Sequence, residues 1–356
     1  MKSLAAILVE LGRPLELVSL EVPALKPGQV LVEVGCSGVC HTQVLEVRGH
    51  RGKDPYVPHC LGHEGAGTVL EIGAGVSKVK VGQRVILSWI KGGGADVPGT
   101  VYQAGGQAGG RAVNAGAVTT FQTHALVSEN RLTPLRNGAA ALSFGDAAML
   151  GCALPTGLGA VFNTARPSPG QSLAVLGAGG VGLCAIMGAV TAGCYPVIAV
   201  DINPHKLQVA RQLGATHTIN PSQEKLADAV AAATSGSGGL DFAIEATGRP
   251  EVMRQALELV RMRGGTAVVI GNARADESLS FDPKQLNLGK RLLGTWGGDS
   301  DPDRDYPRYA NLVTAGRLSL TPLKSEGYTL ERINEALDDL ESGRAVRPLV
   351  TIKKES

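Results

Sequence analysis

The chain has 356 residues, of which 44% are hydrophobic and 19% are charged. A single hydrophobic core stops growing at about 250–300 residues, so this length predicts two domains of a globular protein. The formal net charge is +2, from 34 basic and 32 acidic side chains. This balance gives no sign of the concentrated basic surface that nucleic acids require, and we expect no nucleic-acid partner. No apolar run approaches the roughly 20 residues of a membrane helix, so we expect no membrane partner.

The cysteines and the N-terminal segment indicate the cellular compartment. Six cysteines are spread over the chain without the dense spacing of a disulfide framework, which favours thiols over disulfides. The apolar stretch from Leu4 to Val9 is followed at once by Glu10 and Arg13, and no small-residue cleavage site follows it. It therefore predicts a first strand rather than a signal peptide, and we expect a cytoplasmic protein.

The first third of the chain carries short apolar segments separated by Gly, Pro and Lys residues, a pattern typical of strands. The expected strands cover residues 3–10, 15–22, 29–39, 67–73, 83–90 and 121–130. They predict a β-rich first domain. The segment 91–116 has nine glycines and no period, so we expect an excursion loop there. A helical tract at 145–162 then leads to a Pro- and Gly-rich connection.

From residue 172 onwards apolar strands alternate with helical segments. Such alternation predicts an α/β fold with a doubly wound parallel sheet. Expected strands begin at residues 172, 196, 216, 240, 266 and 291, with helices between them, and Asn203 and Pro204 are the expected N-cap and first residue of one helix. Beyond this sheet, a polar stretch at 299–309 precedes a helix at 310–315, and residues 349–354 are an expected strand.

A dinucleotide-binding motif follows the first of these strands. Gly177, Gly179 and Gly182 form G-x-G-x-x-G between an apolar strand and a helix, which is the context that a phosphate-binding turn needs. Asp201 lies at the end of the second strand, where its carboxylate can accept hydrogen bonds from ribose hydroxyls and would repel a 2′-phosphate. The pattern predicts NAD as cofactor rather than NADP. The alternatives are tight helix packing without a ligand and, for Lys206, a solvated lysine instead of a ribose contact.

Four other residues have the chemistry of a metal site. Two thiolates and an imidazole, from Cys40, His63 and Cys152, bind Zn²⁺ well and leave a coordination position open for substrate oxygen. Glu64 adds a carboxylate next to the histidine. The cysteines and the histidine are far apart in the sequence, so spacing alone does not establish this site.

Several motifs of the chain together resemble the zinc-dependent medium-chain alcohol dehydrogenases. They are GVCHT at 38–42, GHEGAG at 62–67, GQRV at 82–85, GCALPTG at 151–157 and GAGGVG at 177–182. The resemblance implies a GroES-like catalytic domain from residues 1–153 and 297–356, and a Rossmann NAD-binding domain from 154–296. It also implies an active site in the cleft between them.

The resemblance assigns zinc ligation to Cys40, His63 and Cys152, with Glu64 as the carboxylate beside the metal. One catalytic zinc per chain is expected. The resemblance also implies that Thr42 accepts the alcohol proton. The alternative is that Thr42 is only a small polar residue at a helix start.

The resemblance also extends to cofactor contacts. His41 and Arg347 match positions that face the pyrophosphate of the cofactor, although Arg347 has the alternative of a plain surface arginine. Thr156 and Val181 match positions that line the nicotinamide. The alternative is that their side chains only pack against neighbouring residues. Gly180 belongs to the glycine turn.

The chain departs from the family pattern at several positions. Segment 91–116 lacks the four cysteines of a structural zinc site, so we expect no structural zinc. Gln43 replaces an aspartate that orients the metal histidine, which makes it a weaker partner for His63. Leu45 stands where a histidine or tyrosine often helps to release the proton, so a different proton path is expected. Three side chains in the loop before residue 62 are candidates for substrate contact or proton relay: His50, the nearest in sequence, His59 and Cys60.

These residues predict an enzyme that transfers hydride between a small alcohol, or an aldehyde or ketone, and NAD. Two alternatives are a zinc-free quinone- or enoyl-type reductase of the same superfamily and a dinucleotide-binding protein without turnover. The substrate stays open among polyols, sugar-linked alcohols and thiol adducts of formaldehyde. A homodimer or homotetramer is expected, with the apolar strand 291–296 as the contact.

Overall fold

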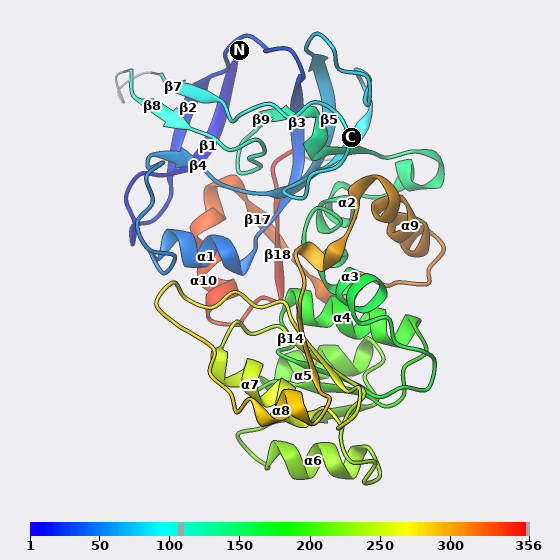
Figure 1. Cartoon of the computed structure of the whole chain (residues 1–356). Coiled ribbons are helices and arrows are strands. Elements are labelled where there is room, and N and C mark those ends of the chain that lie inside the picture. The colour runs from blue at the N-terminus through cyan, green and yellow to red at the C-terminus, as the bar shows by residue number, and fades with distance from the viewer. Residues whose placement is uncertain (106–109, 354–356) are drawn as a thin grey trace. The chain divides into compact units, whose positions relative to one another are not determined.

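The computed structural model describes residues 1–105 and 110–353 and divides into two units (Figure 1). Unit 1 comprises Met1–Cys152, Asp301–Gly316 and Lys324–Ser356, and unit 2 comprises Ala153–Ser300 and Arg317–Leu323. The segment 317–323 therefore groups with unit 2, whereas the sequence places it in the catalytic domain. Across the described residues no helix has the length and apolarity to span a membrane.

Unit 1 is built from a small closed barrel and a seven-stranded sheet. The barrel strands, in spatial order, are β1 (Lys2–Leu8), β2 (Glu16–Glu21), β7 (Val101–Ala104), β8 (Ala112–Asn114) and β4 (His59–Cys60). The sheet runs in the order β10 (Leu132–Pro134), β6 (Arg84–Ser88), β5 (Glu64–Ile72), β3 (Gln29–Gly38), β18 (Arg347–Thr351) and β17 (Lys324–Thr329), and β9 (His124–Ser128) pairs with β3. The helices of this unit are α1 (His41–Val47), α2 (Phe144–Met149), α9 (Pro302–Thr314) and α10 (Ile333–Glu341).

The last strand of the chain lies beside a strand from its beginning. β18 pairs antiparallel with β3, with Val350 opposite Ser37. Val30, Val32 and Val34 of β3 alternate with neighbouring residues and are completely buried in the core. The backbone N–H and C=O groups of a buried strand need partners, and the tail of the chain supplies them at residues 36–38 of β3.

The glycine-rich segment is more ordered than an excursion loop. β7 and β8 lie within it and pair antiparallel, with Tyr102 opposite Val113, and residues 106–109 between them are outside the described residues. Tyr102 is fully buried, and its hydroxyl accepts a hydrogen bond of 2.9 Å from the backbone N–H of Leu126. The sequence analysis missed these strands because three or four residues among so many glycines are too few to show an alternation.

The beginning of the same segment is fastened by one carboxylate. Glu129 is 2% exposed and accepts backbone N–H bonds from Ser77 at 2.6 Å, Lys78 at 2.7 Å and Ala95 at 2.8 Å. A buried carboxylate needs such donors because burial removes its water. Glu129 thus holds the loop at residue 95 against the turn at residues 77–78.

A second prediction is corrected in the polar stretch 299–309. This stretch is not a loop before a short helix, since α9 begins at Pro302 and ends at Thr314. The Asp301 side chain accepts a hydrogen bond of 3.0 Å from the N–H of Asp303, and proline occupies the first helical position. An N-cap aspartate followed by proline is a helix start signal, and the acidic composition obscured it.

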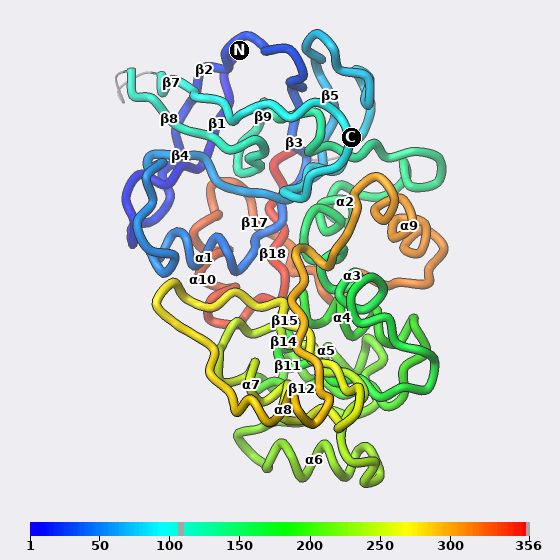
Figure 2. Tube along the Cα trace, in the orientation of Figure 1, coloured from blue at the N-terminus to red at the C-terminus, as the bar shows by residue number. Residues whose placement is uncertain are grey.

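Unit 2 is a six-stranded, all-parallel sheet with helical connections (Figure 2). Its order is β13 (His217–Ile219), β12 (Val197–Val200), β11 (Leu173–Leu176), β14 (Phe242–Glu245), β15 (Thr266–Val269) and β16 (Arg291–Gly294). Numbered along the chain, this order is 3-2-1-4-5-6, that of dinucleotide-binding folds. The helices are α3 (Ala153–Gly159), α4 (Gly180–Thr191), α5 (Pro204–Gln212), α6 (Leu226–Ala233), α7 (Pro250–Leu259) and α8 (Lys284–Asn287). The predicted fold class is confirmed.

Candidate active site

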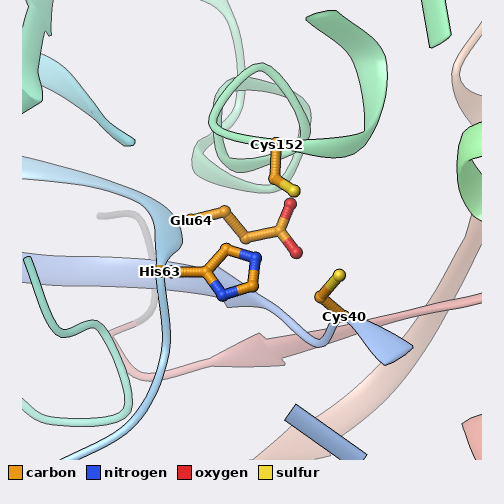
Figure 3. A group of neighbouring side chains, drawn as sticks. All are labelled: Cys40, His63, Glu64 and Cys152. Atoms are coloured by element: carbon orange, nitrogen blue, oxygen red, sulfur yellow. The ribbon is translucent and has the colours of Figure 1, made fainter. Parts of the chain in front are cut away.

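Four side chains from three separate parts of unit 1 point toward one another (Figure 3). They are Cys40, His63, Glu64 and Cys152, and their ligand atoms all lie within 4.8 Å of one another. Cys40 directly precedes α1, His63 directly precedes β5, Glu64 is the first residue of β5, and Cys152 follows α2. The fold therefore brings together the residues that the sequence analysis selected as metal ligands.

Two glycines leave the room that this group occupies. A Cβ atom on Gly38 would lie 2.8 Å from Cδ of Glu64, and one on Gly151 would lie 2.9 Å from Cβ of Glu64. Distances this short are not tolerated between carbon atoms in a packed interior. Any larger residue at position 38 or 151 would therefore displace Glu64 from the group.

The two thiols have opposite acidities because they are neighbours. Hydrogen bonds from Cys152 and His63 lower the pKa of Cys40 well below its ordinary value, although burial opposes this shift. The pKa of Cys152 is raised well above its ordinary value, because its hydrogen bond to Cys40 and its burial both disfavour a second thiolate. Both sulfurs can be thiolates side by side when a cation lies between them.

The indole of Trp89 contacts the group from outside. Its Nε1–H donates a hydrogen bond of 3.3 Å to Sγ of Cys152, and its ring packs edge-on against His63 with the centroids 6.5 Å apart. A donor to a ligating sulfur reduces the charge on that sulfur and holds its orientation. The sequence analysis did not anticipate this contact, since an aromatic residue at the end of a strand carries no signal for it.

Arg347 is buried beside the metal group and is not a plain surface arginine. Its side chain is 3% exposed and forms an ion pair with Oε1 of Glu64, and its Nε has no partner in the described residues. Burial opposes the charge of this guanidinium, but the negative charges of Glu64, Cys40 and Cys152 raise its pKa. Arg347 is buried because β18 begins at this residue inside the sheet of unit 1.

The remaining oxygen of Glu64 is available to a cation. Oε2 is buried and has no hydrogen-bond partner in the described part of the chain. Together with two sulfurs and an imidazole it makes a donor set of the kind that zinc prefers. The residues present thus fit a zinc ion, with Cys40, His63 and Cys152 as ligands and Glu64 beside them.

The residues next to Cys40 occupy the first turn of α1. His41 is exposed, Thr42 is half-buried and Gln43 is fully buried. Oε1 of Gln43 accepts a hydrogen bond of 2.8 Å from the N–H of Cys40, so this side chain fastens the ligand Cys40. Leu45 occupies the position at which the family often has a residue that helps to release the proton. Its side chain is half-buried on the same helix.

Unit 2 presents the glycine turn between β11 and α4. Gly177 has φ +100°, and a Cβ on Gly182 would lie 1.8 Å from the carbonyl oxygen of Gly177. A Cβ on Gly179 would meet no atom within 4 Å, so the backbone at this N-cap of α4 is open to a ligand. Backbone N–H groups at a helix N-terminus bind phosphate, and Gly180 and Val181 form the start of this helix.

The acidic residue at the end of the second strand is tied to this turn. Oδ2 of Asp201 accepts a hydrogen bond of 2.8 Å from the N–H of Ala178, and Oδ1 accepts one of 2.8 Å from the N–H of Asn203. The predicted N-cap Asn203 is also observed, since its side chain accepts from the N–H of His205. Lys206 lies half-buried in the first turn of α5. The arrangement fits a dinucleotide with its ribose at Asp201.

Two further residues predicted for the site, Thr156 and His59, have defined surroundings. Thr156, in α3, is 6% exposed, and its Oγ1 has no partner among residues 1–105 and 110–353. His59 is paired with Asp54, at 2.8 Å between Nε2 and Oδ2. Neither His50 nor Cys60 belongs to the metal group.

A thiolate and imidazole metal group on a β-rich unit, followed in the same chain by a dinucleotide turn on a parallel sheet, defines a metal-dependent dehydrogenase. The comparisons with known proteins agree. Residues 26–137 match a family model described as an alcohol dehydrogenase GroES-like domain. Residues 180–315 match one described as a zinc-binding dehydrogenase.

The chain belongs to the zinc-dependent medium-chain alcohol dehydrogenases. It is 33% identical to an S-(hydroxymethyl)glutathione dehydrogenase of Synechocystis over 98% of this chain and 100% of that relative. Among solved structures it is similar to an alcohol dehydrogenase zinc-binding domain protein from Burkholderia ambifaria, with a TM-score of 0.90, 31% identity and coverage of 99% and 100%. Benzyl alcohol dehydrogenase from Acinetobacter calcoaceticus gives a TM-score of 0.88 at 29% identity, with 99% of each chain covered.

The predicted activity class is confirmed by this membership. The protein is an oxidoreductase that acts on alcohols with zinc and NAD. Neither a zinc-free reductase nor a dinucleotide-binding protein without turnover is better supported.

Proposed function

We propose that the chain oxidises a small alcohol, or reduces the corresponding carbonyl compound, at a single zinc ion held by Cys40, His63 and Cys152. The observation that carries this proposal is the convergence of these ligand atoms with Glu64 within 4.8 Å. Zinc in such a site supplies a Lewis acid that lowers the pKa of the alcohol hydroxyl, so that hydride can leave for NAD.

The side chains around this group have supporting roles in the proposal. Arg347 anchors Oε1 of Glu64 through a buried ion pair, so that the carboxylate keeps its place beside the ligands. Trp89 donates to Sγ of Cys152 and orients it. Thr42, on the first turn of α1, accepts the proton of the alcohol hydroxyl with its Oγ1 and passes it on. Arg347 and Trp89 thus hold the metal-binding side chains in place, and Thr42 moves the proton.

Unit 2 has the cofactor role in the proposal. The open backbone at Gly179 and the start of α4, at Gly180 and Val181, take the pyrophosphate. Asp201 takes the ribose hydroxyls, with Lys206 as a second contact, and Thr156 lines the nicotinamide. His41 contributes to pyrophosphate binding. Arg347, which is paired with Glu64, contributes to pyrophosphate binding as well.

The proposal is tested by metal analysis together with turnover. The purified protein should hold about one zinc per chain after dialysis, and a panel of alcohols should produce NADH that absorbs at the nicotinamide wavelength. Cys152→Ser should abolish turnover and lower the zinc content while the circular dichroism spectrum stays the same. A zinc-loaded protein that oxidises none of the alcohols and reduces no carbonyl compound would overturn the proposal.

We also propose a homodimer that forms through β16 and acts in the cytoplasm. β16 is the last strand of the sheet of unit 2, and Leu293 on it is 39% exposed. An unpaired apolar edge favours pairing with a second copy. A reducing compartment is supported by the six cysteines, which are present as thiols rather than disulfides.

A further inference from the structure

A buried hydroxyl group lies at the centre of a hydrogen-bond network beside the metal group. It belongs to Ser88, which is the last residue of β6 and is 1% exposed. Ser88 lies directly opposite Glu64 of β5 in the antiparallel sheet. Residues opposite each other on antiparallel strands direct their side chains to the same face, so the hydroxyl lies on the face of the sheet that carries Glu64.

Three partners use the full hydrogen-bonding capacity of this hydroxyl. Oγ of Ser88 donates to the carbonyl oxygen of Gly151 at 2.7 Å and accepts from the backbone N–H of Ile90 at 3.1 Å. Its third partner is the hydroxyl of Tyr306, at 2.7 Å. A serine hydroxyl has one proton to donate and two lone pairs that accept. Since its proton goes to the carbonyl oxygen, the tyrosine hydroxyl must be the donor to Ser88.

The network reaches the metal ligand Cys152 along two routes. The first route is the backbone, because Gly151 directly precedes Cys152 in the sequence. The second route is Trp89, whose indole Nε1–H donates to Sγ of Cys152 at 3.3 Å. Trp89 lies between Ser88 and Ile90, and the hydrogen bond between these two residues holds its backbone. One hydroxyl group thus fixes both the backbone before the ligand and the residue that contacts its sulfur.

The place of Cys152 in the chain makes these contacts important. Cys152 lies in a turn between α2 and α3. It is the last residue of unit 1, since the chain continues into unit 2 at Ala153. A ligand there takes its backbone position within unit 1 from the residue before it, Gly151. A Cβ on Gly151 would lie 2.4 Å from the carbonyl oxygen of Leu87, so this backbone lies directly against β6.

Tyr306 connects the network to α9. Its side chain is completely buried, and burial raises the pKa of its hydroxyl well above the ordinary value. The phenol therefore keeps the proton that it donates to Ser88. Tyr306 lies 218 positions from Ser88, in the segment Asp301–Gly316 with which the chain re-enters unit 1. Its hydrogen bond links α9 to the backbone that precedes the ligand.

We propose that Ser88 is a positioning residue for the metal ligand Cys152, and that Tyr306 holds the hydroxyl of Ser88 in the orientation that this role requires. Both residues act through Gly151 and Trp89 and not as ligands. The inference rests on the proposed function, because it takes Cys152 as a zinc ligand. Removal of a group that orients a metal ligand typically reduces metal affinity or activity by about 10–100-fold.

The first arm of the test measures zinc affinity by competition with a chelator of known affinity. Ser88→Ala leaves the carbonyl oxygen of Gly151 without its donor, so we expect zinc affinity to fall by about 10-fold or more. Tyr306→Phe keeps the ring and removes one hydrogen bond, which should reduce zinc affinity by about 2- to 10-fold. Tyr306→Phe also provides the comparison if Ser88→Ala does not fold.

Tyr102→Phe is the matched control for this arm. Tyr102 lies in the barrel strand β7, is also completely buried, and accepts a hydrogen bond from the N–H of Leu126 with its hydroxyl. Its replacement removes a buried hydroxyl of the same kind from the same unit, but from a residue outside the metal group. We therefore expect Tyr102→Phe to reduce stability and to keep the zinc affinity of the wild type. An equal loss of zinc affinity in Tyr102→Phe and Tyr306→Phe would overturn the specific role of the network.

The second arm asks whether Tyr306 acts through Ser88. Adding Tyr306→Phe to Ser88→Ala should weaken zinc binding little further, since the hydroxyl to which Tyr306 donates is already gone. Residues in one hydrogen-bond network show such non-additive effects, whereas the effects of independent sites add. Additive losses of zinc affinity would overturn the role given to Tyr306.

The third arm uses a readout that a general loss of stability does not change. Co²⁺ bound in place of zinc absorbs visible light in bands that depend on the geometry of its ligands. Ser88→Ala should shift the thiolate-to-cobalt bands, and Tyr102→Phe should keep the spectrum of the wild type. Zinc affinity that depends on Ser88 in a protein that oxidises no alcohol would support the positioning role and refute the dehydrogenase proposal. Wild-type zinc affinity and cobalt bands in Ser88→Ala, in a protein that oxidises alcohols, would overturn the positioning role and leave the dehydrogenase proposal intact.

Discussion

At the scale of single residues, the proton and the charges around the metal group decide the chemistry. Thr42 is the proposed proton acceptor, and Leu45 replaces the residue that often continues the relay. We expect Thr42→Ala to reduce kcat by about 10²–10⁴, the usual effect of a positioned proton transfer. His50→Ala is the control, since His50 is not in the metal group. Wild-type kcat for Thr42→Ala between pH 6 and 9 would show that the proton leaves by another route.

The carboxylate of Asp201 should determine which cofactor is used. Its two oxygens already accept backbone N–H groups of the glycine turn and of residue 203, so it is held at the ribose position. A 2′-phosphate there would meet like charge. We expect kcat/KM to be higher with NAD than with NADP. In Asp201→Ser the two kcat/KM values should become more similar. Equal use of both cofactors by the wild type would contradict this role.

The ion pair of Arg347 with Glu64 makes a prediction about stability. Removing one partner of a buried pair leaves an uncompensated charge, at a cost of about 3–5 kcal/mol. Arg347→Met should therefore lower the free energy of unfolding by this amount in denaturant melts and reduce zinc retention. Adding Glu64→Gln to this variant should recover part of the stability. An Arg347→Met enzyme as stable as the wild type would contradict this stabilising role of the ion pair.

At the scale of elements, Glu129 fastens the start of the glycine-rich segment. Burial opposes its charge, but the N–H groups of Ala95, Lys78 and Ser77 and the charge of Lys78 outweigh this effect and lower its pKa. Its contribution to stability is therefore present above the ordinary pKa of glutamate and is lost as the pH falls through the lowered value. Glu129→Gln should cost about 1–3 kcal/mol at pH 7, and the difference from the wild type should shrink in acid. Glu71→Gln, at an exposed glutamate of β5, should have no such effect.

Element prediction succeeded where the pattern was long and failed where it was short. The central strands β11, β12 and β14 of unit 2 are buried on both faces, so each appears as an apolar run bounded by turn residues. β7 and β8 each have at most four residues, and the start of α9 is hidden in acidic sequence. β7 and β8 form because they pair with neighbouring strands of the barrel. The start of α9 is set by the side chain of Asp301, which caps it.

At the scale of the whole molecule, β16 is the expected contact between two copies. We expect light scattering to give twice the chain mass of 36.7 kDa. Leu293→Lys places a charge on the exposed strand and should shift the equilibrium to monomer, because edge charges oppose strand pairing. Val101→Lys, at a 50% exposed strand position of unit 1, should leave the mass unchanged. A mass of one chain at every concentration would refute the dimer.

The sequence by itself determined the two-part α/β plan, the glycine turn with Asp201, and the group of Cys40, His63, Glu64 and Cys152. Each of these features can be recognised from a local sequence pattern or from the chemistry of residues within a short motif. Only the tertiary structure decided that Arg347 belongs to Glu64, since these residues are 283 positions apart. Partnership between distant polar groups is set by packing, and no local pattern records it.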